Sequence, residues 1–219
     1  KEICYALPSQ DFTSSTREAM NSTEVFRFSH PKVFNMIYIS LDNELKVKTH
    51  YKIGCILMEL ASEENANEKI YETAAQLNLG SQMISDIEEK LKIAFANLAA
   101  GRKAKLSSAY EQAISYLSKG ISLLPENIWE YRYDLSYNLY LEMAECLHLN
   151  HDFEKADEIF SLLLCNSKTN LDKAKVFKLR IRLLTNQVKI DDTIDAGLEA
   201  LKILGVKLSK KPSKSMLLQ

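Results

Sequence analysis

Three residues of metal-ligating type lie within six positions of one another in the second half of the chain: Cys146, His148 and His151. Thiolate and imidazole are ligands that zinc prefers, and the two histidines are spaced so that one helix face can hold both. A structural zinc site needs four ligands, however, and no second cluster supplies the others. We therefore interpret these residues as the end of one helix and the turn into the next, and we predict no metal site.

Basic residues at helical spacing follow further along the chain, at Lys175, Lys178 and Arg182. On one helix face they would offer an anion or an acidic partner several charge-assisted hydrogen bonds. The alternative is a solvated face that pairs with the aspartates of segment 191–195, because surface ion pairs are common and contribute little. We take these three residues, together with Tyr131, as a candidate partner surface.

Four aromatic residues form a further helical stripe, at Trp129, Tyr133, Tyr137 and Tyr140. Such spacing usually marks the buried face of a helix. The stripe therefore favours core packing, with tyrosine hydroxyls that reach an edge of the core, over a platform for a peptide or a flat ligand.

The sequence contains none of the common catalytic motifs. It has no Gly-x-x-x-x-Gly-Lys-Ser/Thr loop, so the chain alone has no cradle for the phosphates of ATP. The His-Arg-Asp and Asp-Phe-Gly motifs of protein kinases and the Gly-x-Ser-x-Gly motif of hydrolases do not occur either. We therefore expect neither enzyme activity nor a cofactor in this chain.

Composition predicts that helices position these side chains. Only 6 glycines and 4 prolines occur among 219 residues, too few for the frequent turns of a β-sandwich or barrel. The 28 Lys and Arg nearly balance the 29 Asp and Glu, which argues against non-specific nucleic-acid binding. No apolar run reaches the roughly 18 residues that span a bilayer. The scattered cysteines are typical of reduced thiols, so we expect a cytoplasmic chain that binds neither nucleic acid nor membrane.

The apolar period becomes helical from Pro31 onward. Gly80 and Gly101 are expected to end helices, because glycine is favoured just past a helix C-terminus. The helix before Gly101 has an apolar stripe of Ile87, Leu91, Ala94, Phe95 and Leu98. We expect about nine helices in all.

The second half of the chain repeats one pattern three times. The units begin at Tyr110, Phe153 and Ile190, which are 43 and 37 residues apart. This is the period of a helix-hairpin repeat, and a single hairpin leaves an apolar face exposed, so the units are predicted to stack. Small residues are expected to let helix backbones approach closely at Ala113, Ala156, Gly197 and Ala200.

Several segments carry a resemblance to a known family. They comprise residues 99–105, 109–117, 123–129, 144–146, 152–156, 185–187 and 197–206. In sequence they resemble the tetratricopeptide-like helical arm of the signal-transduction ATPases with numerous domains. Members of that family typically carry a serine/threonine-kinase-like domain, then the ATPase, then this arm, and often GAF and histidine-kinase modules. Residues 26–30 resemble the segment where the winged-helix domain of the ATPase ends.

The resemblance implies an all-α superhelix of antiparallel helix hairpins, with a short β-hairpin remnant at the N-terminus. Residues 1–41 would end a winged-helix-like domain, 42–101 would be linking helices, and 102–219 would be tetratricopeptide-like repeats truncated at the C-terminus. The chain departs from the family at Val188, where a turn glycine is usual. The third hairpin is therefore expected to turn less tightly.

The resemblance also implies a role for His30, which precedes the helix opened by Pro31. In this class of ATPase a histidine at this junction reads the phosphates of the nucleotide and couples them to domain opening. His30 is thus a candidate nucleotide-sensing residue, with ATP or ADP and Mg²⁺ held by the parent ATPase domain. The alternative is a histidine that only caps or packs at a helix start.

Taken together, these features favour a non-catalytic regulatory arm. Such an arm would bind a protein or ligand and pass that state to other domains of the same polypeptide. The alternative is a free-standing tetratricopeptide scaffold that binds peptides in a concave groove. A phosphate loop encoded upstream of Lys1 would distinguish the arm from the scaffold.

Overall fold

A computed structural model describes residues 30–60 and 66–210, and every regular element in these ranges is helical. The all-α prediction is confirmed for this part of the chain, whereas the expected N-terminal β-hairpin lies outside it. The elements are α2 (Pro31–Ser40), α3 (Asn43–Leu60), α4 (Ala66–Gly80), the 3₁₀ helix η1 (Ser81–Met83), α5 (Ile87–Leu106), α6 (Tyr110–Ser122), α7 (Ile128–Tyr131), α8 (Tyr133–Leu149), α9 (Phe153–Asn166), α10 (Asn170–Asn186) and α11 (Ile190–Ile203).

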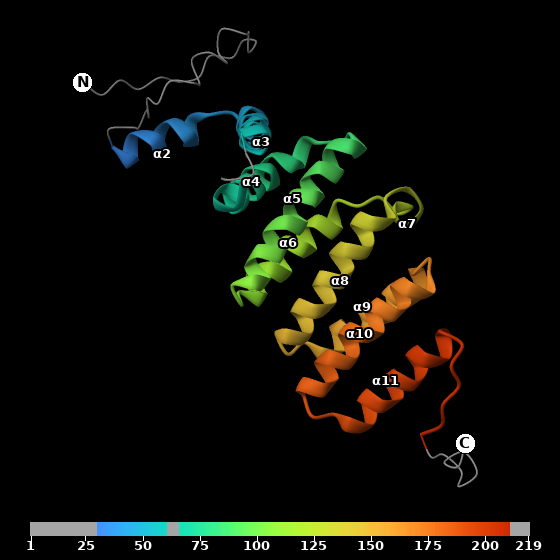
Figure 1. Ribbon diagram of the computed structural model, residues 1–219. Coiled ribbons are helices and arrows are strands. Elements are labelled where there is room, and N and C mark those ends of the chain that lie inside the picture. The colour runs from blue at the N-terminus through green and yellow to red at the C-terminus, as the bar shows by residue number, and fades with distance from the viewer. Residues whose placement is uncertain (1–29, 61–65, 211–219) are drawn as a thin grey trace.

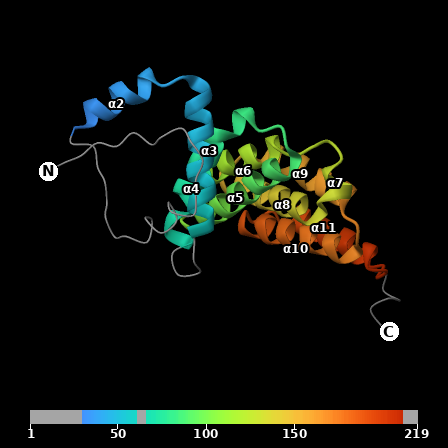
Figure 2. The same ribbon diagram turned by 90° about the horizontal axis from the view of Figure 1, so that it is seen from above.

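The helices pack as hairpins in chain order (Figure 1). Helix α3 packs on α4, α5 on α6, α8 on α9, and α10 on α11. Neighbouring hairpins meet mainly through α4 and α5, α6 and α8, and α9 and α10. Helix α2 projects from one end of this stack, as the view from above also shows (Figure 2). It has no buried residue.

Three of the hairpin turns have the same backbone geometry. Ser108, His151 and Val188 all have positive φ, at 57°, 65° and 59°. In each turn the next residue donates its N–H to the carbonyl five residues earlier: Ala109 to Ala104, Asp152 to Leu147 and Lys189 to Leu184. These are helix-ending Schellman turns. The turns recur at the spacing of the three sequence units.

The third turn contradicts one expectation. Val188 closes the same hydrogen-bonded turn as the other two residues, with Lys189 N to Leu184 O at 3.2 Å, so the turn is no looser for lack of glycine. A β-branched side chain is strained in the left-handed region. Packing of α10 against α11 holds the conformation in spite of that strain.

The core runs along the stack and is centred on α5, α6, α8, α9 and α10. Leu117, Leu139 and Phe160 are at most 1% exposed there. The predicted small residues Ala113 and Ala156 are fully buried between helices. The prediction that helix backbones approach closely at Ala200 is wrong, because Ala200 is only half-buried.

The predicted close approach of helices is also wrong at Gly197, where an added Cβ would meet nothing within 4 Å. Helix α11 is the last described helix, and in this part of the chain only α10 packs closely on it. In the earlier hairpins the equivalent residues are buried between two neighbouring helices. On α11 they have only α10 as a neighbour in the described part of the chain.

Gly80 ends α4 as predicted, but the expectation that a helix ends near Gly101 is wrong. Helix α5 continues to Leu106, and Gly101 is buried within it. A Cβ at Gly101 would lie 2.7 Å from Leu117 Cγ, so glycine here allows α5 and α6 to approach closely. The expected boundary between residues 101 and 102 falls inside α5.

Among the residues that the structure describes, no helix combines the length and the apolar character needed to cross a bilayer.

Candidate functional site

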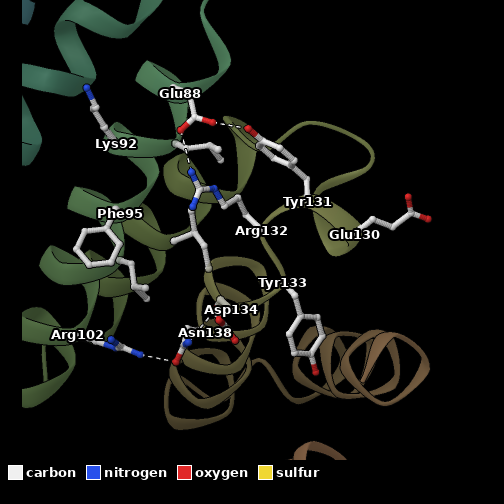
Figure 3. A pocket seen from close by; sticks show the side chains of 13 residues that line it. Glu88, Lys92, Phe95, Arg102, Glu130, Tyr131, Arg132, Tyr133, Asp134 and Asn138 are labelled. Atoms are coloured by element: carbon white, nitrogen blue, oxygen red, sulfur yellow. Dashed lines mark hydrogen bonds and ion pairs between the residues drawn. The ribbon is translucent and has the colours of Figure 1, made fainter. Parts of the chain in front are cut away.

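A groove of about 630 Å³ lies between α5, α7 and the start of α8 (Figure 3). Its walls contain apolar, aromatic and charged side chains from all three helices. The principal lining residues are Glu88, Lys92, Phe95, Arg102, Tyr131, Arg132, Tyr133 and Asn138. Grooves that combine apolar area with a few fixed polar groups are the usual form of a binding site.

Phe95 is the main apolar feature of the groove, and its side chain is 63% exposed. It belongs to the apolar stripe expected from the sequence but does not lie in the core. Helix α5 packs against α4, α6 and α8, and Leu91, Ala94 and Leu98 fill those contacts. Phe95 lies at the edge of these faces and points into the groove (Figure 3).

A second hollow of about 240 Å³ adjoins the first and shares Phe95, Leu98 and Arg102 with it. Its other lining residues are Ile70, Ala99, Lys103 and Leu106. Leu106 is 84% exposed. We call the two hollows together the Phe95 groove, since the Phe95 side chain borders both.

One end of the groove is closed by a polar contact between α5 and α7. Glu88 accepts hydrogen bonds from the Tyr131 hydroxyl and from Arg132 Nη2, the latter at 3.0 Å. The bond from Tyr131 lowers the pKa of Glu88, and the same bond raises the pKa of Tyr131. Arg132 has non-helical backbone angles, which separate α7 from α8 and bring both residues to Glu88.

Arg102 is held in place on the groove wall by two residues of α8. Its Nε donates to Glu142 Oε1 at 2.8 Å and its Nη2 donates to Asn138 Oδ1 at 2.6 Å. Asn138 in turn donates to the Asp134 carbonyl at 2.7 Å. The guanidinium is therefore positioned before any ligand arrives, which reduces the entropy lost on binding.

The contact of Arg102 belongs to a charge network that crosses three hairpins. Lys105 lies 2.5 Å from Glu142 and 2.6 Å from Glu145, and Arg182 of α10 pairs with Glu145. Burial opposes the charge on Lys105, but the two carboxylates outweigh burial and raise the pKa of this lysine. The network ties α5 to α8 and α8 to α10.

The residues predicted as a partner surface do not form one site. Tyr131 lies in the Phe95 groove, whereas Lys175, Lys178 and Arg182 lie on α10 and do not line it. Lys175 pairs with Asp172 on its own helix at 3.3 Å. Lys178 is exposed.

The alternative interpretation, a solvated face of α10 that pairs with the aspartates of α11, meets a different set of pairs in the described residues. Arg182 pairs with Glu145 of α8, and Arg180 with Asp157 of α9 at 3.1 Å. Asp191 and Asp195 pair with Lys210 instead. The sequence shows which residues carry charge but not which helix lies opposite them.

The aromatic stripe packs in the core, as predicted. The rings of Trp129 and Tyr140 stack with centroids 5.2 Å apart, and Tyr137 is buried. The hydroxyls of Tyr133 and Tyr137 reach the start of α10, where they donate to the side chain and the carbonyl of Asp172 at 3.0 and 2.8 Å. These bonds fix α10 against α8.

Cys146, His148 and His151 take the structural positions expected of a helix end and a turn. Burial raises the pKa of the Cys146 thiol to about 12 and lowers the pKa of His148. The His148 and His151 rings both contact the Phe153 ring edge-on, at centroid distances of 5.0 and 5.7 Å. Within the described residues, no three His, Cys, Asp or Glu side chains gather as metal ligands would.

His30 is the N-cap residue of α2. Its Nδ1 accepts a hydrogen bond from the Lys32 N–H at 3.1 Å, and Pro31 occupies the first helical position. The side chain is exposed, and α2 lies at the opposite end of the stack from α11 (Figure 1). The capping role is therefore observed, while the nucleotide-sensing role stays a prediction.

Sequence reasoning singled out Tyr131 but missed Phe95, Arg102 and Glu88 as groove residues. One available signal was the position of Phe95 next to Ala94, since adjacent residues face directions about 100° apart on a helix. Ala94 and Phe95 therefore cannot both lie at the centre of one buried face.

Comparison with known proteins gives one informative similarity. No protein-family model matches the chain, and no solved structure matches it. Over 146 residues the chain is 27% identical to hybrid signal transduction histidine kinase G of Dictyostelium discoideum. The match covers 63% of this chain and 4% of that protein, so the chain spans only a small part of its relative's length.

Proposed function

We propose that this chain is a non-catalytic regulatory arm of a larger signal-transduction polypeptide. It binds a protein segment or ligand in the Phe95 groove and relays that state to ATPase and kinase domains of the same polypeptide, in the cytoplasm. The observation that carries the proposal is the exposed Phe95 side chain in a groove with a pre-positioned Arg102.

The similarity to a hybrid signal transduction histidine kinase supports the signalling context. The identical turns at Ser108, His151 and Val188 support a tetratricopeptide-like superhelix, because such solenoids repeat one hairpin geometry. Stacked hairpins transmit a change at one interface to the next, and the Arg102–Glu142–Lys105–Glu145–Arg182 network spans three of them. A ligand that favours one arrangement of the stack therefore shifts the population of the whole arm.

In this proposal ATP or ADP and Mg²⁺ bind to the ATPase domain and not to this chain, and His30 senses the nucleotide across the domain junction. The exposed position of His30, on a helix without buried residues, supports such a contact. Its N-cap bond to Lys32 supports a second role, in which it orients the start of α2.

The experiment compares kinase autophosphorylation of the intact signalling polypeptide with that of its Phe95→Ala variant. Loss of the groove ligand should change the rate about fivefold or more, since coupling between sites is commonly of that size. Lys202→Gln, on an exposed site of α11, is the matched control and should leave the rate unchanged. Equal rates in all three proteins would refute the regulatory role.

A free-standing peptide-binding scaffold is the second candidate, and the same groove favours it. The two functions differ in one observable. A scaffold would bind its peptide through Phe95 without any effect of that binding on ATP turnover or autophosphorylation.

A further inference from the structure

The charges around Phe95 are not evenly distributed. In the smaller hollow the charged lining residues are Arg102 and Lys103, and the rest of the lining is apolar. Lys92, one turn before Phe95 on α5, lines the larger hollow and is exposed. Helix α5 therefore contributes three cations to the two hollows that Phe95 borders, and Glu88 as its one carboxylate there.

The larger hollow has three acidic lining residues, which are Glu88 on α5, Glu130 on α7 and Asp134 on α8. Glu88 is already engaged by Tyr131 and Arg132. The Glu130 side chain points away from Phe95 and Arg102 (Figure 3). Asp134, on the first turn of α8, is the remaining acidic residue of the lining. The larger hollow is therefore balanced in charge, with Lys92, Arg102 and Arg132 against these three carboxylates, whereas both charged residues of the smaller hollow are cations.

Arg102 retains hydrogen-bonding capacity for a ligand. A guanidinium has five N–H donors, and the bonds to Glu142 and Asn138 use one on Nε and one on Nη2. The side chain is 44% exposed while those bonds hold its orientation. Such a fixed guanidinium is suited to a carboxylate, which it binds with planar, charge-assisted geometry.

We propose that the Phe95 groove binds an acidic peptide segment with apolar side chains. Apolar side chains of the peptide pack on Phe95 and on Leu106, and its Asp or Glu carboxylates pair with Arg102, near the ammonium group of Lys103 that lies over the Tyr71 ring at 4.8 Å. The inference rests on the proposed function and names the ligand class of the same groove. Charge complementarity selects this occupant over a basic segment, which the cations of α5 would repel.

The test uses fluorescence anisotropy with two short fluorescein-labelled synthetic peptides. One consists of Asp, Glu, Leu and Phe, and the other has the same order with Lys and Arg in place of the acids. The full chain should bind the acidic peptide, and added salt should weaken the binding. Phe95→Ala and Arg102→Gln should each weaken it about tenfold, the size expected for a central interface residue. Lys103→Gln should weaken it as well, and Lys202→Gln, on an exposed site of α11, should not.

Circular dichroism of each variant separates lost binding from lost folding, and Phe95→Ala removes an exposed side chain, so it should fold normally. Equal binding of the two peptides, binding insensitive to Phe95 and Arg102, or no binding of the acidic peptide would each overturn the inference. If the basic peptide alone binds, and does so through Phe95, the groove is a binding site but the acidic class is wrong. The autophosphorylation experiment decides the proposed function independently, because it does not depend on the ligand's charge.

Discussion

Lys105 on α5 lies 2.6 Å from Glu145 on α8, across the junction between two hairpins. Both side chains are largely shielded, at 20% and 16% exposure, so water screens the pair only in part. Glu145 also pairs with Arg182 of α10 and therefore joins three hairpins.

The first prediction concerns Glu145. Glu145→Gln should lower the free energy of unfolding by about 1–2 kcal/mol, since it leaves a partly buried lysine with one carboxylate fewer. Urea unfolding measures the change. The control is Glu44→Gln, which removes an exposed pair with Lys48 on α3 and should cost less than about 0.5 kcal/mol. Equal losses in the two variants would show that the Glu145 pairs stabilise the fold no more than an exposed ion pair does.

The second prediction concerns the fully buried Ala156 of α9. Ala156→Leu should destabilise the fold by about 1–3 kcal/mol, because the larger side chain overpacks the helix interface. Ala200→Leu is the matched control, since Ala200 on α11 is only half-buried. Thermal unfolding should show a clearly lower midpoint for the Ala156 variant, and similar midpoints would mean that α9 packs loosely.

The third prediction concerns Val188, with φ of 59° and a side chain 76% exposed. Val188→Gly should stabilise the protein by about 1 kcal/mol, because it relieves left-handed strain and loses little buried surface. Val206→Gly, at a second exposed valine whose φ is not positive, should be neutral or destabilising. Chemical denaturation of both variants provides the comparison. Destabilisation by Val188→Gly would contradict the inference that the backbone of Val188 is strained.

The fourth prediction concerns pH. Burial lowers the pKa of His148 from the ordinary value of 6.5, so the folded chain binds a proton there less readily than the unfolded chain. Stability contributed by the neutral imidazole is therefore present at neutral pH and lost as the pH falls below about 6.5. The slope of unfolding free energy against pH should be smaller in His148→Leu than in the wild type. Identical slopes between pH values of about 7.5 and 5.5 would refute a role for His148.

The fifth prediction concerns ATP. The purified chain should neither bind nor hydrolyse Mg-ATP, because it lacks a phosphate loop. Calorimetric titration with Mg-ATP should show no saturable heat. Saturable binding would contradict the assignment of nucleotide to another domain.

The local structure of the hairpins was predictable from sequence because it depends on neighbouring residues. The units at Tyr110, Phe153 and Ile190 begin helices as expected, and the turns before them share one geometry. Gly101 misled the prediction because a glycine at close helix packing has the same sequence signal as a glycine at a helix end. Only the position of Leu117 on the neighbouring helix distinguishes the two cases.

The groove could be predicted only in part, because it forms between helices. Phe95 is an apolar residue in an apolar helix. It is exposed because neither α4 nor α8 covers its position on α5. The partners of Arg102 and Arg182 lie 36 to 40 residues away in sequence, and no local spacing identifies them. Periodicity gives the faces of a helix but not the number of neighbours that cover them.

The central claim is that occupancy of the Phe95 groove is relayed to catalytic domains. Its most direct test is the autophosphorylation rate of the intact signalling polypeptide, measured with and without the acidic peptide, in the wild type and in Phe95→Ala. The peptide should change the wild-type rate and leave the rate of the Phe95→Ala variant unaltered. A peptide that binds the wild type through Phe95 but changes neither rate would contradict the claim, as would an equal change in both proteins.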